Sequence, residues 1–127
     1  SVAGGLHHGL TAAADLKMPV CQIFTKNANQ WLAKPLTPEA IAQFKATHQS
    51  TKITSVFSHA SYLINLASPN ADLWKKSIDA LVIELERAAA LGLAGVVVHP
   101  GAFVDTSAPE GVLRIQRAIE TIFGQFQ

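Results

Sequence analysis

Strand-like and helical patterns alternate along the whole chain, and this alternation limits its fold more than any other feature. Short apolar runs at residues 20–25, 51–57 and 95–98 are typical of strands. Amphipathic helical patterns precede the first run and follow every run. Because the connections are short, the order α-β-α-β-α-β-α predicts an α/β protein with a parallel sheet and crossover helices.

Capping signals place the ends of these helices. The run Thr37–Glu39 offers a cap, a first-turn proline and an acidic residue for the second helix. Ser68 and Pro69 offer a cap and a first-turn residue for the third, which Gly92 is placed to end. A capping-box pattern from Ser107 to Glu110 opens the last. The expected apolar stripes are Trp74, Ile78, Leu81, Leu85 and Ala88 in the third helix, and Val112, Ile115, Ile119, Ile122 and Phe126 in the last.

The unmatched ends of the pattern suggest an incomplete sheet. The first helix lacks a preceding strand, and no strand follows the last helix. A free sheet of this kind would have two bare edges and one uncovered face. Only 15% of the residues are charged, against roughly 25% in a typical soluble domain. We therefore expect residues 1–127 to be a single partial domain, a piece of a larger barrel, rather than a complete small α/β protein.

Composition excludes several classes of protein and site. No apolar run approaches the ~20 residues of a membrane-spanning helix. The net charge is +1 and the basic residues are scattered, so charge alone predicts no nucleic-acid surface. The single cysteine, Cys21, excludes an internal disulfide and fits a reducing, cytoplasmic compartment. The sequence holds no zinc-finger, metalloprotease, phosphate-loop or dinucleotide-binding pattern.

Two histidines follow successive predicted strands and are the main functional signal. His59 follows the second strand, and His99 follows the third, just before Pro100 and Gly101. Neighbouring parallel strands lie about 4.8 Å apart, so both imidazoles could reach one metal at Zn–N distances of about 2.0–2.1 Å. Alternatively, each histidine is an inert, hydrogen-bonded residue at the mouth of the sheet. The other histidines, His7, His8 and His48, fall on predicted helices and are interpreted as helix-face residues.

Four segments, taken in order, resemble the endonuclease IV family. These are SVAGGL at 1–6, FTKNANQW at 24–31, HASYLINLASP at 59–69 and HPG at 99–101. The family consists of zinc-dependent apurinic/apyrimidinic (AP) endonucleases built on a (β/α)8 TIM barrel of the xylose-isomerase-like type. The resemblance covers the whole chain and corresponds to about the first half of a family member, with the βα units near strands two to four.

The resemblance implies a reaction and a metal site. Family members use three zinc ions at the carboxyl-terminal mouth of the barrel to cleave the phosphodiester 5′ to an abasic site in double-stranded DNA. They leave a 3′-hydroxyl and a 5′-deoxyribose phosphate, a step of base-excision repair. His59 and His99 match ligands of one zinc ion. The remaining ligands belong to strands beyond this chain, so we expect no complete catalytic set here, at most one partial zinc site, and no activity of the isolated chain.

The resemblance also implies how DNA is bound. Loops matching Lys26–Trp31 and Ala60–Tyr62 enter the minor groove and hold the abasic nucleotide flipped out of the helix, which costs least where no base is stacked. Asn27, Asn29, Gln30 and Tyr62 are the DNA-binding candidates, and the full-length protein is expected to be a monomer.

The chain departs from the family pattern at three places. Asn29 stands where an arginine is frequent, Ala60 where an aspartate is frequent, and Ala102–Phe103 where Ser-His is common. Two other functions stay open. One is a metal-dependent sugar isomerase or epimerase of the same barrel group, and the other is a non-catalytic DNA-binding remnant. The polar loop from Asn27 to Trp31 favours the nuclease over the isomerase, because it suits a DNA wedge and has no evident role in closing on a sugar.

Overall fold

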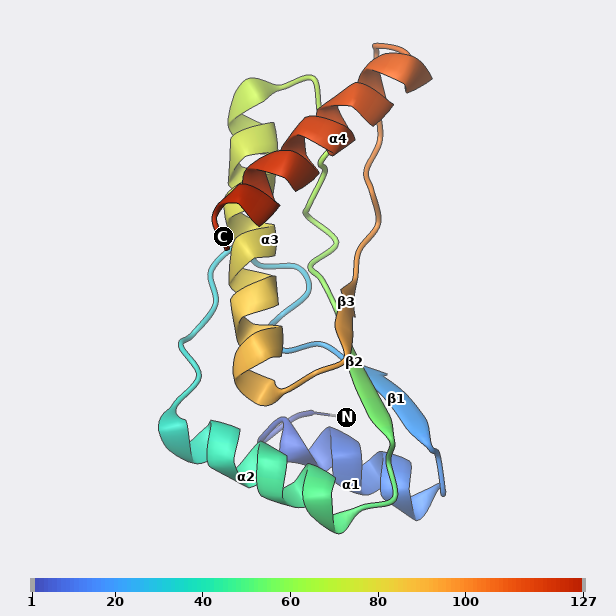
Figure 1. Cartoon of the computed structure of the whole chain (residues 1–127), viewed down its shortest axis with the longest axis vertical. Coiled ribbons are helices and arrows are strands. Elements are labelled where there is room, and N and C mark those ends of the chain that lie inside the picture. Colours follow the sequence, from blue (N-terminus) through green and yellow to red (C-terminus); the bar gives the residue numbers. More distant parts are fainter. Residues whose placement is uncertain (1, 127) are drawn as a thin grey trace.

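The computed structural model describes residues 2–126, which form seven elements in the predicted order (Figure 1). The α/β prediction is therefore confirmed. The elements are α1 (His7–Asp15), β1 (Val20–Ile23), α2 (Pro38–Ser50), β2 (Ser55–His59), α3 (Ala71–Leu91), β3 (Gly95–Val97) and α4 (Ala108–Gly124).

The strands form one parallel, three-stranded sheet in the order β1-β2-β3. In the first pair, Val20 lies opposite Ser55 and Ile23 opposite Ser58. In the second pair, His59 lies opposite Val97. Because all three strands run the same way, the loops that follow them gather at one end of the sheet.

One face of the sheet packs against the helices and the other is largely open. Ile23 and Val56 belong to one buried cluster, and Val96 and Val98 pack against a second. Side chains alternate between the faces of a strand. Val97, which lies between Val96 and Val98, therefore projects to the opposite face, where it is 42% exposed. This agrees with the expectation of a sheet covered on one side only.

Two apolar clusters stabilise the chain. The first joins α1, α2 and the end of α3 to β1 and β2, with Leu10, Phe44 and Leu91 fully buried in it. The second joins α3 and α4 to the residues after β2, with Ile78 and Ile122 at its centre. Of the helices, α1 packs directly on β1 and α3 on β3, whereas α2 packs on α1 and α3, and α4 packs on α3.

The helix ends largely follow the sequence signals. The Thr37 side chain accepts a hydrogen bond from Ala40 N at 3.2 Å, and Ser107 and Glu110 complete the capping box of α4. Gly92 ends α3 with φ 70°, in the left-handed region that favours glycine.

The predicted start of α3 was wrong by two residues. Asn70, not Ser68, is the cap, and its side chain accepts a hydrogen bond from Leu73 N at 2.8 Å. The buried Ser68 hydroxyl is used one turn earlier, where it accepts from Asn70 N at 3.2 Å. Pro69 therefore belongs to the turn before the helix.

The second strand begins later than predicted. It runs from Ser55 to His59, whereas the sequence pattern placed it at 51–57. Thr51 instead caps the end of α2, and its hydroxyl donates to His48 O at 2.9 Å. His59 is consequently the last residue of the strand rather than a loop residue, which fixes its side chain direction.

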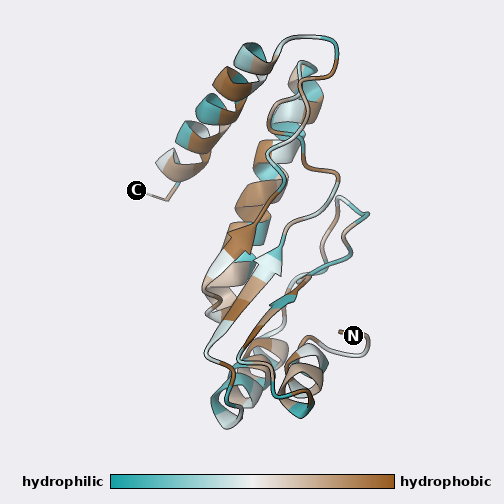
Figure 2. Ribbon diagram, turned by 90° about the vertical axis from the view of Figure 1, so that its right-hand side faces the viewer, coloured by the Kyte–Doolittle hydropathy of each residue, from teal (hydrophilic) through white to brown (hydrophobic). Residues whose placement is uncertain are grey.

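The apolar stripe predicted for α4 is only partly buried. Ile122 is 1% exposed, but Val112, Ile119 and Phe126 are 62%, 43% and 51% exposed. The apolar positions of α4 and of the strands stand out in Figure 2. This helix packs chiefly along α3, so one side of its stripe has no covering layer. Within residues 2–126, no helix has the length and apolarity needed to cross a membrane.

Candidate metal centre and nucleic-acid interface

The imidazoles of His59 and His99 lie side by side at the carboxyl-terminal end of the sheet. Their ring centroids are 5.0 Å apart. His59 ends β2 opposite Val97, and His99 follows Val97 by two positions, so alternation sends all three side chains to the open face. His59 is 8% exposed and His99 is exposed. The pairing of the strands thus brings the two histidines together.

A backbone contact fixes the proton of His59. Its Nδ1 lies 2.7 Å from Ala60 O. A carbonyl oxygen can only accept, so Nδ1 carries the hydrogen and donates it. In the neutral ring this tautomer leaves the lone pair on Nε2, which is the form of imidazole that binds a metal.

Aromatic rings surround His59. Phe24, the residue after β1, has its ring centroid 5.3 Å from that of His59. Tyr62 lies 5.2 Å from His59 and 6.0 Å from His99 by the same measure. Tyr62 is 57% exposed, so one side of its ring is open to a partner. The rings shield the His59 imidazole and restrict its rotation.

Asn65 holds the loop that carries His99. Its Nδ2 donates to Ala102 O at 3.0 Å, and its Oδ1 accepts from Ala102 N at 3.0 Å. Gly101 lies beneath this contact with φ 115°, and a Cβ there would stand 2.1 Å from Asn65 Oδ1. Only glycine fits this position without displacing the asparagine.

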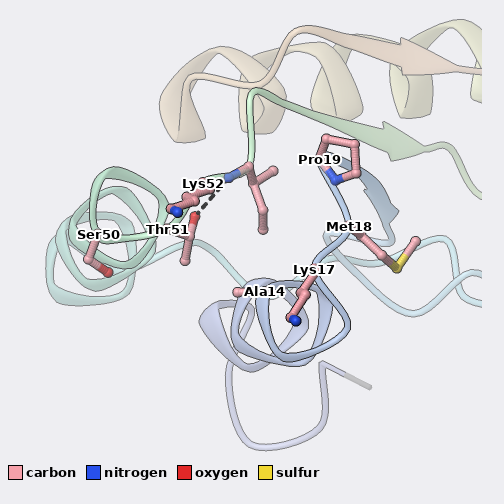
Figure 3. A pocket seen from close by; sticks show the side chains of 8 residues that line it. Ala14, Lys17, Met18, Pro19, Ser50, Thr51 and Lys52 are labelled. Atoms are coloured by element: carbon pink, nitrogen blue, oxygen red, sulfur yellow. Dashed lines mark hydrogen bonds between the residues drawn. The ribbon is translucent and has the colours of Figure 1, made fainter.

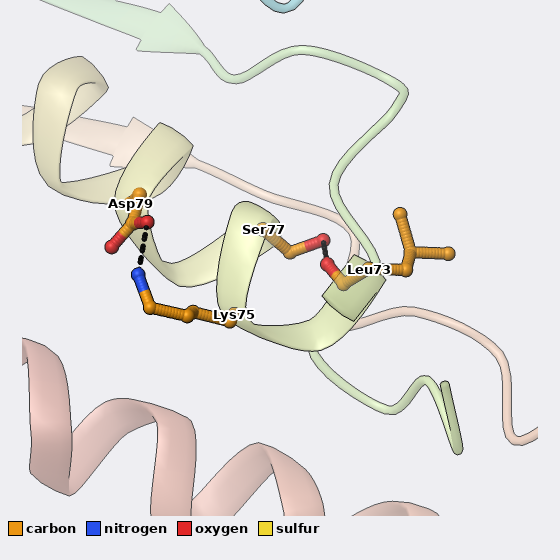
Figure 4. Close-up of polar contacts among 4 residues, drawn as sticks. All are labelled: Leu73, Lys75, Ser77 and Asp79. Carbon is orange, nitrogen blue, oxygen red and sulfur yellow. Dashed lines mark hydrogen bonds and ion pairs between the residues drawn. The ribbon is translucent and has the colours of Figure 1, made fainter. Parts of the chain in front are cut away.

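A serine of α3 holds Asn65 in turn. Ser77 Oγ accepts from Asn65 N at 3.0 Å and donates to Leu73 O at 2.7 Å, as Figure 4 shows for the second contact. The exposed ion pair between Lys75 and Asp79 in the same view lies on the solvent side of the helix. Ser77 therefore anchors the loop after β2 to α3 and, through Asn65, also the loop after β3.

The segment after β1 forms a compact polar turn. Asn27 Oδ1 accepts from Asn29 N at 2.9 Å, and Asn27 O accepts from Gln30 N at 3.3 Å. The Lys26 ammonium donates to Asn27 O and Gln30 O. Burial lowers the pKa of Lys26, and the nearby Glu84 carboxylate opposes that shift. Asn27, Asn29 and Gln30 are all exposed at the surface.

Backbone and side chain contacts join this turn to the loop after β2. Ala28 O accepts from Tyr62 N at 3.0 Å and from Ser61 Oγ at 2.7 Å. Tyr62 is therefore placed by the turn that presents Asn27, Asn29 and Gln30. The four residues that sequence resemblance assigned to DNA binding belong to two loops that contact each other.

Comparison with known proteins identifies the fold family. Residues 10–126 match the model of the xylose isomerase-like TIM barrel family. The chain belongs to this family. Proteins named "Probable endonuclease 4" are similar to it. That of Thermoplasma acidophilum is 43% identical over 96% of this chain and 43% of its own length, and that of Chloroflexus aggregans is 41% identical over 98% and 44%.

Solved structures agree with the assignment to the TIM barrel family. Endonuclease IV from Thermus thermophilus matches with a TM-score of 0.80 and 32% identity, over 95% of this chain and 44% of that one. SacUVDE matches with a TM-score of 0.68 at 14% identity, which shows the fold alone. The resemblance to endonuclease IV inferred from sequence is confirmed. The chain spans less than half the length of these relatives.

The metal-binding potential of this TIM-barrel chain is that of a partial site. No group of three or more His, Cys, Asp or Glu side chains in residues 2–126 is placed to hold a metal ion. Two imidazoles, one with its Nε2 available, suit zinc, which accepts nitrogen ligands and usually takes three or four protein ligands. The other histidines lie away from the site: His7 contacts Gln43 at 3.2 Å, and His48 contacts Ile53 O at 3.0 Å.

The sequence analysis missed Glu84. This residue of α3 is 1% exposed, and its carboxylate reaches both loops beside the histidines. A signal was present, because Ser77, Leu81, Glu84 and Ala88 follow helical spacing and all are buried. A charged residue within a core-facing stripe is uncommon unless it is hydrogen-bonded.

Two other cavities are lined by neither His59 nor His99. A pocket at the amino-terminal end of the sheet is lined by Lys17, Pro19 and Lys52, together with five neighbours shown in Figure 3. It precedes β1 and β2, so it lies at the opposite end from His59 and His99. Cys21 lines another cavity and packs against the first cluster, and burial raises the pKa of its thiol. A raised thiol pKa fits a packing role.

Proposed function

We propose that this chain is the amino-terminal part of a zinc-dependent AP endonuclease. The full-length enzyme hydrolyses the phosphodiester 5′ to abasic sites in double-stranded DNA and leaves a 3′-hydroxyl and a 5′-deoxyribose phosphate. The observation that carries the proposal is the pair of imidazoles, 5.0 Å apart between centroids, beside two loops that hydrogen-bond to each other through Ala28 O and carry exposed polar and aromatic side chains. The names of the relatives support the nuclease assignment.

His59 and His99 are the zinc ligands in this proposal. A zinc ion bound there would act as a Lewis acid on the phosphate and lower the pKa of a bound water to about 7. The chain's own contribution is to orient the ligands. Ala60 O holds the His59 tautomer, the aromatic rings hold its plane, and Asn65 holds the His99 loop.

Asn27, Asn29, Gln30 and Tyr62 are the DNA-contacting residues. The three amide side chains can donate to and accept from base edges and sugar oxygens in the minor groove. The exposed Tyr62 ring can stack on a base, an interaction worth about 1–3 kcal/mol. It lies beside the imidazoles, so a nucleotide held against it would bring its phosphate toward the metal site. Asn29 would insert as a short, neutral side chain.

The remaining zinc ligands would come from the rest of the barrel. The full-length protein would act as a monomer in the cytoplasm, where a free cysteine such as Cys21 stays reduced. A sugar isomerase would also use strand-end histidines, but the relatives named endonuclease 4 and the exposed amide loop favour the nuclease. Lack of aldose isomerisation by the full-length protein would separate the two functions.

Cleavage of a labelled duplex tests the proposal. The full-length protein should cut a duplex carrying a tetrahydrofuran abasic analogue and leave an end that a polymerase can extend. Chelation should abolish cutting and added zinc should restore it. The isolated 127-residue chain should give no cleavage above a His59→Ala/His99→Ala control, because it lacks the later ligands. Undiminished cutting after complete metal removal, or intact DNA with the zinc-loaded protein, would refute the function.

A further inference from the structure

We propose that Glu84, together with Arg87, is a positioning unit that locks the two DNA-contacting loops into one rigid wedge. The turn loop is defined as residues 26–31 and the tyrosine loop as residues 60–62. The inference rests on the proposed function, and it assigns the selectivity for abasic DNA partly to residues that touch neither metal nor DNA.

The Glu84 carboxylate bridges the two loops with its two oxygens. Oε1 accepts from Ser61 N in the tyrosine loop at 3.0 Å, and Oε2 accepts from Thr25 Oγ1, the residue just before the turn loop, at 3.3 Å. The residue is 1% exposed, so water does not compete for these contacts. One carboxylate therefore sets the distance between Thr25 and Ser61.

Arg87 holds the segment around the turn loop. Its Nε donates to Thr25 Oγ1 at 3.1 Å, and its Nη2 donates to Thr25 O. Its Nη1 donates to Lys34 O, beyond the loop, at 2.8 Å. The same hydroxyl of Thr25 thus accepts from Arg87 and donates to Glu84. Both ends of the turn loop are fixed to one helix.

A further contact of α3 reaches the middle of this region. Lys76 Nζ lies 4.5 Å from the centre of the Trp31 ring, a cation–π arrangement. Glu84 and Arg87 lie three residues apart, on one face of a helix of 21 residues. Since a helix of this length moves as a unit, the loops inherit a fixed relative position from it.

The chemistry of Glu84 points to positioning rather than packing. An apolar residue would fill the same place among Leu81 and Ala88 without the cost of burying a carboxylate. An apolar residue could not, however, accept hydrogen bonds from both loops. Ala28 O would still accept from Tyr62 N and Ser61 Oγ, so the loops would keep a connection at one acceptor atom and lose the one through Glu84.

The test replaces Glu84 in the full-length protein. Glu84→Leu should lower the ratio of affinities for abasic and intact duplex by about 10- to 100-fold, the scale of effect that small misplacements produce. Zinc content should not change, because the hydrogen bonds of the Glu84 carboxylate within residues 2–126 go to Thr25 and Ser61 and to neither histidine. Hydrogen exchange should rise in the turn loop and the tyrosine loop together. Glu86→Leu, on the exposed side of the same helix, is the matched control and should leave all three readouts unchanged.

Two further variants keep the test informative if Glu84→Leu does not fold. Glu84→Gln can still accept from Ser61 N and donate to Thr25, so it should retain most of the selectivity. Thr25→Val keeps the shape of the side chain but removes the link between Glu84 and Arg87, so it should reproduce the loss.

The outcomes separate this inference from the proposed function. A lower melting temperature with unchanged selectivity and loop exchange would reduce Glu84 to a structural role and overturn the inference. Zinc loss in parallel with the loss of selectivity would overturn it too. A wild-type protein that binds abasic and intact duplex equally would contradict the proposed function instead, and the exchange measurement would still decide whether Glu84 couples the loops.

Discussion

The ring of His59 lies 5.0 Å from the ring of His99, centroid to centroid. The Nδ1 atom of His59 also lies 2.7 Å from a backbone carbonyl oxygen, that of Ala60. The two histidines are distant in sequence and meet because β2 and β3 are parallel neighbours. The register of this strand pair places the two histidines close enough to be candidate ligands of one metal ion.

Removing either histidine should weaken zinc binding. His59→Ala and His99→Ala in the full-length protein should each lower affinity for one zinc ion by more than about 100-fold, because loss of an outer-shell partner already costs about 10–100-fold. Competition with a chelating dye measures this. His8→Ala, on the exposed face of α1, is the control and should bind as wild type does. Equal zinc affinity in all three variants would exclude the two strand-end histidines as ligands.

Truncating the exposed loop side chains should affect DNA and spare the metal. Gln30→Ala and Tyr62→Ala should each weaken discrimination of abasic from intact duplex. The Tyr62 change should cost about 1–3 kcal/mol of binding through lost stacking. Fluorescence anisotropy with both duplexes gives the ratio, and zinc analysis of the same samples gives the control. Zinc loss in these variants, or an unaltered ratio, would argue against the wedge.

Gly101 should tolerate no side chain. Gly101→Ala should destabilise the protein by about 1–3 kcal/mol, the usual cost of a strained backbone residue. The new Cβ would also meet Asn65 Oδ1 at 2.1 Å. Gly124→Ala is a matched control, because nothing lies within 4 Å of its added Cβ. Urea denaturation should show a large loss for the first variant and a small gain or no change for the second. Equal midpoints would mean that Asn65 does not constrain this loop.

The capping box of α4 should make stability depend on pH. Hydrogen bonds from Ser107 hold the pKa of Glu110 below its usual value of 4.5. A carboxyl with a lowered pKa stabilises the folded state above its unfolded pKa, and this stabilisation is lost as pH falls through the folded pKa. Wild type should therefore melt higher than Glu110→Gln at neutral pH, and the two should converge below pH 4.5. Ser107→Ala should reduce the same pH dependence, because it removes the side-chain hydrogen bond and keeps the one from Ser107 N. A gap between wild type and Glu110→Gln that persists into acid would contradict this origin.

Local sequence rules determined the elements and most of their ends. Helical spacing and the signals at Thr37, Gly92 and Ser107 predicted helices that the structure contains. These predictions succeed because a cap or a glycine acts on residues within one turn of itself. The prediction of the start of α3 failed because Ser68 and Asn70 are both residue types that cap helices. The buried position of Ser68 decided between them.

The arrangement of the candidate site depended on tertiary structure. Sequence order placed His59 and His99 after successive strands, but their separation follows from the register of β2 against β3. The role of Glu84 was likewise hidden, because its partners Thr25 and Ser61 lie far from it along the chain. Residues that are adjacent in sequence fix backbone conformation through short-range sterics and hydrogen bonds. Contacts between distant residues form only when packing of the whole chain brings their elements together, so no local pattern records them.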